Sequence, residues 1–308
     1  MKKGIISVVI PALNEADSLP ELLARIDSTF KKINQDYELI FIDDGSSDNS
    51  TGIVNDFSEK NKIKAKLIRH YRKHGKSLAL MHGFDVAEGE AAILMDADLQ
   101  DIPELIPDFL TKYKEGYDCV VGWRHKRKDP KIKKLVSIIF NSLTAFIYGL
   151  NLHDINCGFK ILSRNAYKLL DLRGDMHRLI PVIIYSGGLK VTEIPIEHAP
   201  RKHGKSRYNL LRYKGLIDIL GFTLLSVTQH RPFHLSVETA VLLFFAFLMS
   251  ILGYIFFLPN IILLLFSCWL LFLVTILPFF GLVVEIISQS YQDRGWRQKS
   301  IKELITHE

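Results

Sequence analysis

Three aspartates and a glutamine follow a short apolar run near the middle of the sequence. The stretch reads ILMDADLQDIPE, residues 93–104. In an extended segment residues i and i+2 face the same way, so Asp96 and Asp98 can point together and Gln100 continues the row. Such hard oxygen ligands suit Mg²⁺ or Mn²⁺, usually with substrate phosphates completing the coordination shell. D-x-D alone is a weak motif, but its place after an apolar strand predicts a divalent metal site for a phosphorylated ligand.

The elements that would position this stretch belong to an alternating pattern. Short apolar runs rich in β-branched residues predict strands at 5–10, 37–42, 65–68, 91–95 and 117–121. Helix-like stretches lie between them at about 17–33, 48–60, 75–88 and 103–115. This alternation predicts an α/β domain with a mostly parallel sheet and right-handed crossovers. Such sheets bind ligands outside the carboxyl ends of their strands.

Polar residues gather at those carboxyl ends. They follow four of the predicted strands, at 11–15, 43–48, 96–100 and 122–124. Any one of these loops could be ordinary turn and cap chemistry, and Asp48 in particular reads as a helix N-cap. Four polar loops on one edge of a sheet are harder to explain in that way, so we expect them to share a site.

Several common sites are excluded by the sequence. It contains no GxGxxG after the first strand, no GxxxxGK[ST] and no HExxH, which argues against a standard dinucleotide fold, a P-loop and a zinc protease site. Cys119, Cys157 and Cys268 lie far apart without metal spacing and are expected to be free thiols. The net charge of +6 favours acidic partners.

The C-terminal third has a different character. Two uncharged runs, 239–258 and 261–284, are each about 20 residues or longer, the length that crosses a bilayer. Pro259 and Asn260 break them apart, so we expect a transmembrane hairpin; a re-entrant or buried pair is the alternative. Basic residues flank only the outer ends of the hairpin: Arg231, Arg294, Arg297 and Lys299. The positive-inside rule then places both termini in the cytoplasm, and the short apolar run at the N-terminus does not resemble a signal peptide.

Two clusters of cations adjoin apolar segments. The first cluster spans 124–134, contains Lys133 and Lys134, and overlaps the start of the apolar segment 132–150. The second cluster spans 201–214 and overlaps the apolar segment 208–226. Both segments have the composition of interfacial helices, and a basic cluster beside such a helix suits a lipid phosphate. The alternatives are a solvated face for the charges and a plain core helix for 132–150.

Five motifs in order resemble a known family. VVIPALNE, IDDGSSD, DADLQDIPE, INCGFK and PRKHGKSRY together resemble the family 2 glycosyltransferases with a GT-A fold, in the branch of dolichyl-phosphate mannosyltransferases and bacterial polyprenyl-phosphate glycosyltransferases. The resemblance covers about residues 4–215. It implies a Rossmann-like GT-A domain at 1–207, juxtamembrane amphipathic helices at 208–234, a transmembrane hairpin at 235–288 with spans at about 236–258 and 261–287, and a basic cytoplasmic tail at 289–308.

The resemblance also implies roles for single residues. Asp96, Asp98 and Arg124 would be catalytic, with Asp98 and Gln100 ligating Mg²⁺ or Mn²⁺. The residues expected at the nucleotide sugar are Pro11, Asn14, Glu15, Asp43, Lys76, Asp96, Arg124, Arg201, Lys205 and Arg207, of which the last three would close over the diphosphate from a mobile loop. The acceptor phosphate is expected near Lys133 and Lys134 of the first cation cluster, and near His177 and Arg178, whose stretch GDMHRLIP resembles a family motif at the acceptor side. Structural hydrogen bonding is the alternative for His177 and Arg178. This chain departs from the family where Arg207 replaces the usual Lys and where Trp123 replaces a small residue.

The implied reaction is an inverting, metal-dependent sugar transfer. The donor would be a UDP- or GDP-linked sugar, and the acceptor undecaprenyl or dolichyl phosphate at the cytoplasmic face of a bacterial or archaeal plasma membrane. A phosphate monoester is mostly dianionic at neutral pH and needs no general base. The partners are thus the donor, the polyprenyl phosphate and the bilayer, without nucleic acid, and homo-oligomers through the membrane and juxtamembrane helices are compatible with this. The bacterial-like hairpin favours UDP.

Two other functions stay open at this point. One is direct transfer to a glycan, glycolipid or protein, which would need a general base for the acceptor hydroxyl. The other is an inactive membrane scaffold, which would have no need of the full set of site residues. A processive polysaccharide synthase is disfavoured, because 292–296 has the residues of a QxxRW motif in the wrong order and lies beyond the last span.

Overall fold

The computed structural model describes residues 4–125, 141–142, 144–145, 148–197, 232–256, 260–292 and 301–307. The chain forms two compact units, which are taken separately below. The first unit comprises 1–218 and 296–308, and the second comprises 219–295.

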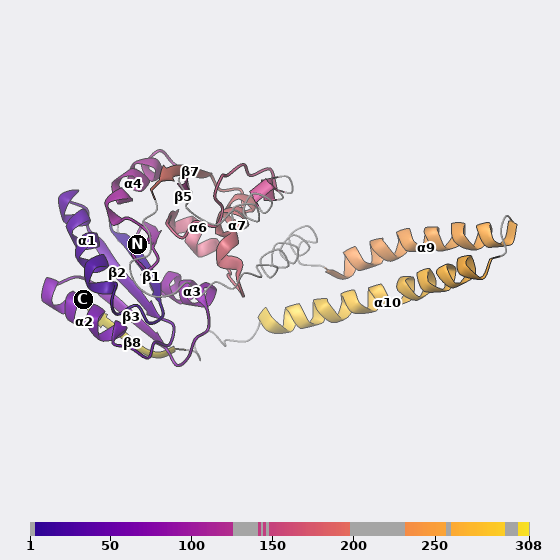
Figure 1. Ribbon diagram of the computed structural model, residues 1–308, viewed down its shortest axis with the longest axis horizontal. Coiled ribbons are helices and arrows are strands. Elements are labelled where there is room, and N and C mark those ends of the chain that lie inside the picture. Colours follow the sequence, from indigo (N-terminus) through magenta and orange to yellow (C-terminus); the bar gives the residue numbers. More distant parts are fainter. Residues whose placement is uncertain are drawn as a thin grey trace. The chain divides into compact units, whose positions relative to one another are not determined.

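The first unit is built on one eight-stranded sheet (Figure 1). Its strands are β1 (Ile6–Ala12), β2 (Tyr37–Asp43), β3 (Ala65–His70), β4 (Ala91–Leu94), β5 (Cys119–Arg124), β6 (Lys160–Ser163), β7 (Val191–Ile196) and β8 (Ile301–His307). Their order across the sheet is β7-β5-β6-β4-β1-β2-β3-β8. The pairs β1–β2, β1–β4, β2–β3 and β5–β7 are parallel. The predicted mostly parallel α/β fold is therefore confirmed.

Two antiparallel strands make the sheet mixed. The strand β6 runs antiparallel between β4 and β5, so these two predicted strands are not neighbours. The strand β8 runs antiparallel to β3 at the sheet edge, within the segment 289–308 that we expected only as a basic tail. Neither strand was predicted from the sequence. β6 has only four residues, and the pairing of β8 joins segments that lie far apart in the chain.

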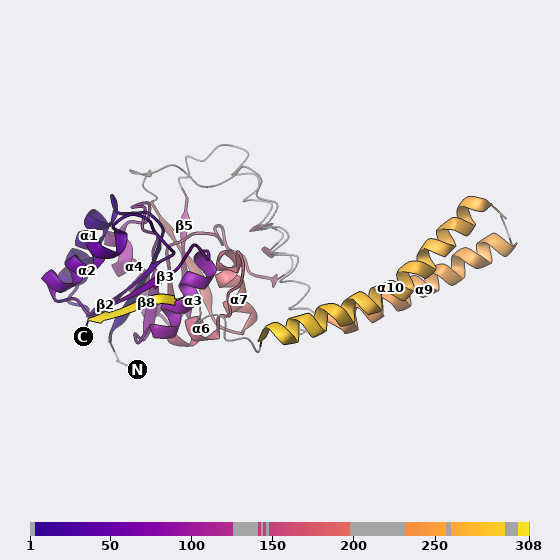
Figure 2. The same ribbon diagram turned by 90° about the horizontal axis from the view of Figure 1, so that it is seen from below.

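Helices cover both faces of the sheet (Figures 1 and 2). One face carries α1 (Leu19–Lys32), α2 (Ser50–Asn61) and α4 (Ile106–Lys114), the last entered through the 3₁₀ turn η1 (Pro103–Leu105). The other face carries α3 (Lys76–Val86), α6 (Arg164–Leu169) and α7 (Ile180–Ser186), with the 3₁₀ turn η2 (Met176–Leu179) before α7. The helices predicted from the sequence correspond to α1, α2, α3 and α4.

The helices α1 and α3 meet the sheet in different ways. The helix α1 buries one stripe at helical spacing, formed by Leu19, Leu22, Leu23, Ile26 and Phe30. The helix α3 is buried on all sides from Ser77 to Phe84. A side chain at Gly83 would come within 2.8 Å of Val9, so α3 lies directly on the strands and has little freedom to shift.

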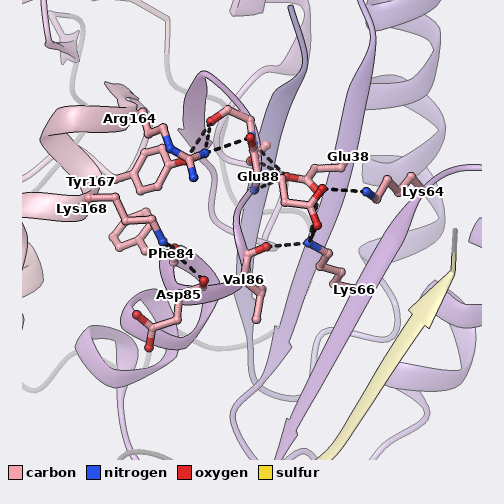
Figure 3. A network of polar contacts seen from close by, with 12 residues as sticks. Glu38, Lys64, Lys66, Phe84, Asp85, Val86, Glu88, Arg164, Tyr167 and Lys168 are labelled. Atoms are coloured by element: carbon pink, nitrogen blue, oxygen red, sulfur yellow. Dashed lines mark hydrogen bonds and ion pairs between the residues drawn. The ribbon is translucent and has the colours of Figure 1, made fainter. Parts of the chain in front are cut away.

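The edge where the parallel strands begin carries a closed polar network (Figure 3). One oxygen of Glu38 accepts hydrogen bonds from Ser7 Oγ at 2.6 Å and from the backbone nitrogens of Glu88 and Gly89 at 2.7 and 3.1 Å. The other oxygen lies 3.6 Å from Lys66 Nζ, which also donates to Glu88 Oε1 at 2.6 Å. Glu38, Lys66 and Glu88 thus each have a partner of opposite sign.

The second unit is a helical hairpin. It consists of α9 (Pro232–Phe256) and α10 (Ile261–Gln292). Both helices are long and apolar enough to cross a membrane, over 233–256 and 261–286, and large apolar side chains such as Leu242, Met249 and Phe272 are exposed along them. Ser250 and Ser267 share a hydrogen bond of 2.7 Å between the two helices. The predicted pair of apolar helices is therefore present.

Candidate functional site

The loop after β1 is tied to the loop after β2 through Asn14. Its backbone has a left-handed φ of 53°. Its backbone nitrogen donates to Ser46 Oγ at 2.8 Å, and its side-chain oxygen accepts from the backbone nitrogen of Ser47 at 2.8 Å. Asparagine tolerates this backbone conformation and can hydrogen bond locally. Asn14, which we predicted to line the nucleotide pocket, therefore joins the loops that follow β1 and β2.

Asp48 makes a second link between these loops. Its Oδ2 accepts from the backbone nitrogen of Ala16 at 3.0 Å, and its Oδ1 accepts from Ser50 Oγ at 2.6 Å. Burial would raise the pKa of Asp48, but the hydrogen bonds from Ser50 and Ala16 lower it. Asp48 stands just before α2, whose first flanking residue is Asn49. The prediction that Asp48 is the N-cap is therefore wrong by one residue, and its carboxylate instead ties the loop after β1 to the start of α2.

The other residues expected at the nucleotide lie at the same place. Pro11 pairs with Ile42 at the end of β1, and the backbone nitrogen of Glu15 donates to Ser50 Oγ at 3.1 Å. Asp43 is buried, and its two oxygens accept from Ser46 N and Thr51 Oγ1, each at 2.6 Å. The structure therefore brings the ends of β1 and β2 together, with the Asp43 carboxylate engaged by its own loop.

The D-x-D stretch forms a turn and not an extended strand. The strand β4 ends at Leu94, and Leu99 has a left-handed φ of 62°. The backbone nitrogen of Gln100 donates to Asp98 Oδ1 at 3.1 Å, which is the local bonding typical of aspartate in turns. The two-residue alternation that we used to align Asp96, Asp98 and Gln100 is therefore wrong for this segment. A turn brings the carboxylates of Asp96 and Asp98 close to that of Asp101 instead.

Negative charge is concentrated in this turn. Asp101 is buried, and its Oδ2 accepts from the backbone nitrogen of Asp96 at 3.0 Å. Burial and the neighbouring charge of Asp96 raise the pKa of Asp101. Lys76 forms an ion pair with Asp96. Like charges held this close would be relieved by a divalent cation.

The turn fits a divalent metal only if ligands come from elsewhere too. Within the described part of the chain, no group of three or more His, Cys, Asp or Glu side chains could hold a metal ion by itself. Asp98 and Gln100 would supply two hard oxygen donors. Mg²⁺ is usually bound by one or two carboxylates, with substrate phosphates and water in the remaining positions. The residues present therefore fit a metal that is bound together with a phosphorylated substrate.

The first turn of α3 brings His177 to the same place. Ser77 Oγ accepts from the backbone nitrogen of His177 at 3.0 Å and lies 3.1 Å from its Nδ1. Burial and the neighbouring cations Lys76 and Arg178 lower the pKa of His177 well below its ordinary value, so its ring is neutral at pH 7. Arg178 pairs with Asp175 at 3.4 Å.

Arg124 is held by an aspartate that the sequence analysis did not single out. Its Nε and one terminal nitrogen donate to the two oxygens of Asp154 at 2.7 and 3.1 Å, and Asp154 is only 2% exposed. The bidentate pair fixes the guanidinium in place. The sequence signal was present, because Asp154 stands just before the INCGFK motif. The neighbouring Trp123 stacks on His153, with ring centroids 4.1 Å apart.

The INCGFK segment itself lies against the D-x-D turn. A side chain at Gly158 would come within 2.8 Å of Asp96 Oδ2, so a glycine is needed for this close approach. The ammonium of Lys160 is buried and donates to the carbonyl oxygen of Cys157. The motif thus forms one wall of the site. Five other predicted residues, Lys133, Lys134, Arg201, Lys205 and Arg207, lie outside the described residues.

Comparison with known families and proteins gives one consistent result. The profile of the family described as "Glycosyl transferase family 2" matches residues 7–170. The undecaprenyl-phosphate 4-deoxy-4-formamido-L-arabinose transferase of Proteus mirabilis is 34% identical over 250 residues, which is 80% of this chain and 75% of that protein. The enzyme of the same name from Klebsiella pneumoniae is 35% identical over 242 residues, covering 79% and 74%.

Solved structures agree on the fold of the first unit. Glucosyl-3-phosphoglycerate synthase from Mycobacterium tuberculosis, in complex with Mn²⁺ and UDP-glucose, superposes with a TM-score of 0.53 at 20% identity over 72% of this chain and 78% of that chain. Mannosyl-3-phosphoglycerate synthase from Rubrobacter xylanophilus gives 0.54 at 17% identity, over 73% and 75%. At such identities the likeness shows the fold alone.

Proposed function

The chain belongs to glycosyl transferase family 2, in its bacterial polyprenyl-phosphate branch, and we propose that it transfers a sugar from a UDP- or GDP-linked donor to undecaprenyl or dolichyl phosphate. The transfer inverts the anomeric centre and depends on Mg²⁺ or Mn²⁺. The product is a lipid-phosphate-linked sugar for modification of the cell envelope. The observation that carries the proposal is the turn at 96–101, where three aspartates gather and Ala97 accepts a hydrogen bond from Ser18 in the segment after β1.

The donor nucleotide is proposed to lie over the ends of β1 and β2. The loops there are locked together by Asn14 and Asp48, so the pocket is largely formed before the ligand arrives. A pre-formed pocket lowers the cost of ordering on binding. Asp98 and Gln100 would hold the metal, which when bound stabilises the charge that develops on the leaving diphosphate. Lys76 stands beside Asp96 and can shift its ammonium toward a diphosphate.

The acceptor is proposed to approach from the side of η2. A phosphate monoester is already nucleophilic at neutral pH, so the chain's task is to hold it in line and not to remove a proton. His177 is neutral and fixed by Ser77, which suits a hydrogen-bond donor better than a general base. Arg178 supplies positive charge next to it. Direct displacement by this phosphate oxygen inverts the anomeric carbon.

The hairpin is proposed to hold the enzyme in the cytoplasmic membrane, with the catalytic unit and both termini on the cytoplasmic side. The evidence is the absence of charge between the two spans together with the basic residues at their outer ends. Asn260→Cys and Ser300→Cys, each in a Cys268→Ser background, test this with a membrane-impermeant thiol reagent. Labelling of intact cells at position 260 and not at 300 is expected. The reverse pattern would overturn the topology.

The activity is tested with the purified full-length chain. A panel of radiolabelled UDP and GDP sugars is incubated with undecaprenyl phosphate and Mn²⁺, and label in the lipid extract is counted. One donor should label the lipid, and excess chelator should stop the transfer. Release of free sugar without lipid product, or transfer only to a glycan or protein, would contradict the proposed acceptor.

A further inference from the structure

Beneath the site, a carboxylate and two imidazoles form a buried chain of hydrogen bonds. Asp44 Oδ1 lies 2.8 Å from His70 Nδ1, and His70 Nε2 lies 2.8 Å from His82 Nδ1. All three residues are buried, with Asp44 6%, His70 1% and His82 2% exposed. They come from three different elements, the loop after β2, the end of β3 and the middle of α3. This chain of hydrogen bonds therefore links the loop after β2 and the strand β3 to the helix α3.

The same carboxylate holds the backbone just before α3. The backbone nitrogen of His74 donates to Asp44 Oδ1 and that of Gly75 donates to Oδ2, both at 2.8 Å. Burial would raise the pKa of Asp44, but the hydrogen bonds from His70, His74 and Gly75 outweigh it and lower the pKa. Asp44 is thus a charged acceptor that clamps the entry to α3.

The helix α3 is consequently tied to the Asp44–His70 pair at two points. One is its entry at His74 and Gly75, and the other is His82, which lies six residues beyond Lys76. Two attachments to one rigid group fix both the position of the helix along its axis and its rotation about it. The all-round burial of α3 gives it no exposed face on which to turn.

The first turn of α3 carries the two contacts that reach the site. Lys76 pairs with Asp96 in the D-x-D turn, and Ser77 Oγ accepts from the backbone nitrogen of His177. We propose that Asp44, His70 and His82 are positioning residues of the transferase, which hold the start of α3 so that Lys76 and Ser77 are set toward Asp96 and His177. The inference rests on the proposed function for the role of that site, but the hold on α3 can be tested without it.

Buried polar pairs contribute little net stability compared with apolar side chains of the same volume. What these hydrogen bonds add is a defined position and rotation of the helix α3. Each hydrogen bond has a narrow range of distance and angle, whereas apolar contacts tolerate sliding. The same logic applies where a second group fixes the orientation of a metal-bound histidine.

The test compares two substitutions at His82. Asparagine places an amide near the position of Nδ1 and can donate to or accept from His70 Nε2, whichever protonation state the ring has. Leucine fills similar space without a hydrogen bond. His82→Asn should keep most of the transfer rate, whereas His82→Leu should lose about tenfold, the size expected when two groups couple by about 1.4 kcal/mol. Met81→Leu, at the adjacent buried position, is the matched control and should change nothing.

A double-mutant cycle then asks whether the effect passes through the first turn of α3. In the full-length chain, His82→Leu should slow transfer in the wild type but have little further effect in a background that carries both Lys76→Ala and Ser77→Ala. If the loss from His82→Leu is as large in that background as in the wild type, the positioning role is refuted. The role is likewise refuted if leucine at 82 matches or exceeds asparagine, because packing alone would then explain the site.

Hydrogen exchange gives a readout that does not depend on activity. The amide protons of His74 and Gly75 should be protected in the wild type and in His82→Asn, and should exchange faster in Asp44→Asn and His82→Leu, with the melting temperature as the check on folding. Unchanged protection in both latter variants would overturn the inference. If no donor supports transfer even in the wild type, the proposed function fails instead. The exchange data still decide whether the hydrogen bonds of Asp44, His70 and His82 hold α3 in place.

Discussion

The amino ends and the carboxyl ends of the parallel strands in the catalytic sheet both bury charge, but they arrange it in opposite ways. At the edge where the parallel strands begin, Lys66 lies between Glu38 and Glu88, so positive and negative groups alternate (Figure 3). At the edge where the strands end, Asp96, Asp98 and Asp101 are crowded into one turn with the same sign of charge. The residue types are similar, and only the arrangement differs.

The difference separates residues that stabilise the fold from residues kept for a ligand. Alternating charges with several hydrogen bonds recover much of the cost of burial. A cluster of like charges does not, and it raises the pKa of Asp101 in addition to the effect of burial. Functional sites commonly keep such unfavourable arrangements, at some loss of stability. Mutations where the strands begin should therefore lower stability and leave activity unchanged. Mutations where the strands end should lower activity and leave stability unchanged.

The largest effect is expected for Asp98→Asn at the carboxyl edge. Losing one of few protein ligands to the metal should remove several kcal/mol of transition-state stabilisation, or about a thousandfold in transfer rate. The melting temperature should stay the same or rise, because like charges in the turn are reduced. Transfer assays and thermal unfolding of the same preparation measure both. A variant that loses stability along with activity would remove the distinction between the edges.

The mirror experiment is Glu38→Gln at the amino edge. It removes the charge of buried Glu38 while Lys66 keeps its 2.6 Å contact with Glu88, so the weakened hydrogen bonds to position 38 should cost about 2 kcal/mol of unfolding free energy. Chemical unfolding of the full chain measures this, and the transfer rate per folded molecule should equal that of the wild type. Reduced donor affinity in the folded variant would mean that the two edges are coupled.

Gly45→Ala should damage both properties. Gly45 has a left-handed φ of 85°, and a side chain there would lie 2.6 Å from the carbonyl carbon of Arg72. We expect a loss of about 2 kcal/mol in stability together with weaker nucleotide binding, since the loop after β2 must move. Gly116→Ala is the control, because it has a φ of 93° with nothing within 4 Å. It should lose about 1 kcal/mol and bind nucleotide normally; equal losses of binding in both would refute the local explanation.

The smallest effect concerns Glu88 and pH. Hydrogen bonds from Lys66 and Lys64 lower the pKa of Glu88 to about 2, from an ordinary value of 4.5. A lowered pKa contributes stability that is present above pH 4.5 and is lost as pH falls toward 2. The carboxylate is 41% exposed, so solvent screening should limit the contribution to below about 1 kcal/mol. The melting temperatures of wild type and Glu88→Gln should differ at pH 7 and converge as pH approaches 2; a constant gap would contradict this.

The sequence was informative where structure follows from local pattern. The helix-like stretch at 17–33 predicted α1, and the apolar runs predicted β1 to β5. It failed where the outcome depends on distant segments. The pairing of β8 with β3 brings together residues more than 200 positions apart, and no local pattern records it.

The same distinction holds for the site. Asp96, Asp98 and Gln100 were selected by residue type and by their place after a strand, although the alternation argument for them was wrong because the chain turns at Leu99. Asp154 was missed, since its partner Arg124 lies 30 residues away. His70 and His82 were not selected, because their hydrogen bond to each other exists only once β3 and α3 are packed. Residue type suggests candidates, and only the fold shows which of them touch.

The most direct test of the central claim is the rate of sugar transfer to undecaprenyl phosphate as free Mn²⁺ is varied, in wild type, Glu38→Gln and Asp98→Asn. The account predicts that wild type and Glu38→Gln share one Mn²⁺-dependent curve that falls to zero in excess chelator, while Asp98→Asn stays near zero throughout. Full transfer by the wild type in excess chelator, or a wild-type rate in Asp98→Asn, would contradict the assignment of the metal and the reaction to the carboxyl edge of the sheet.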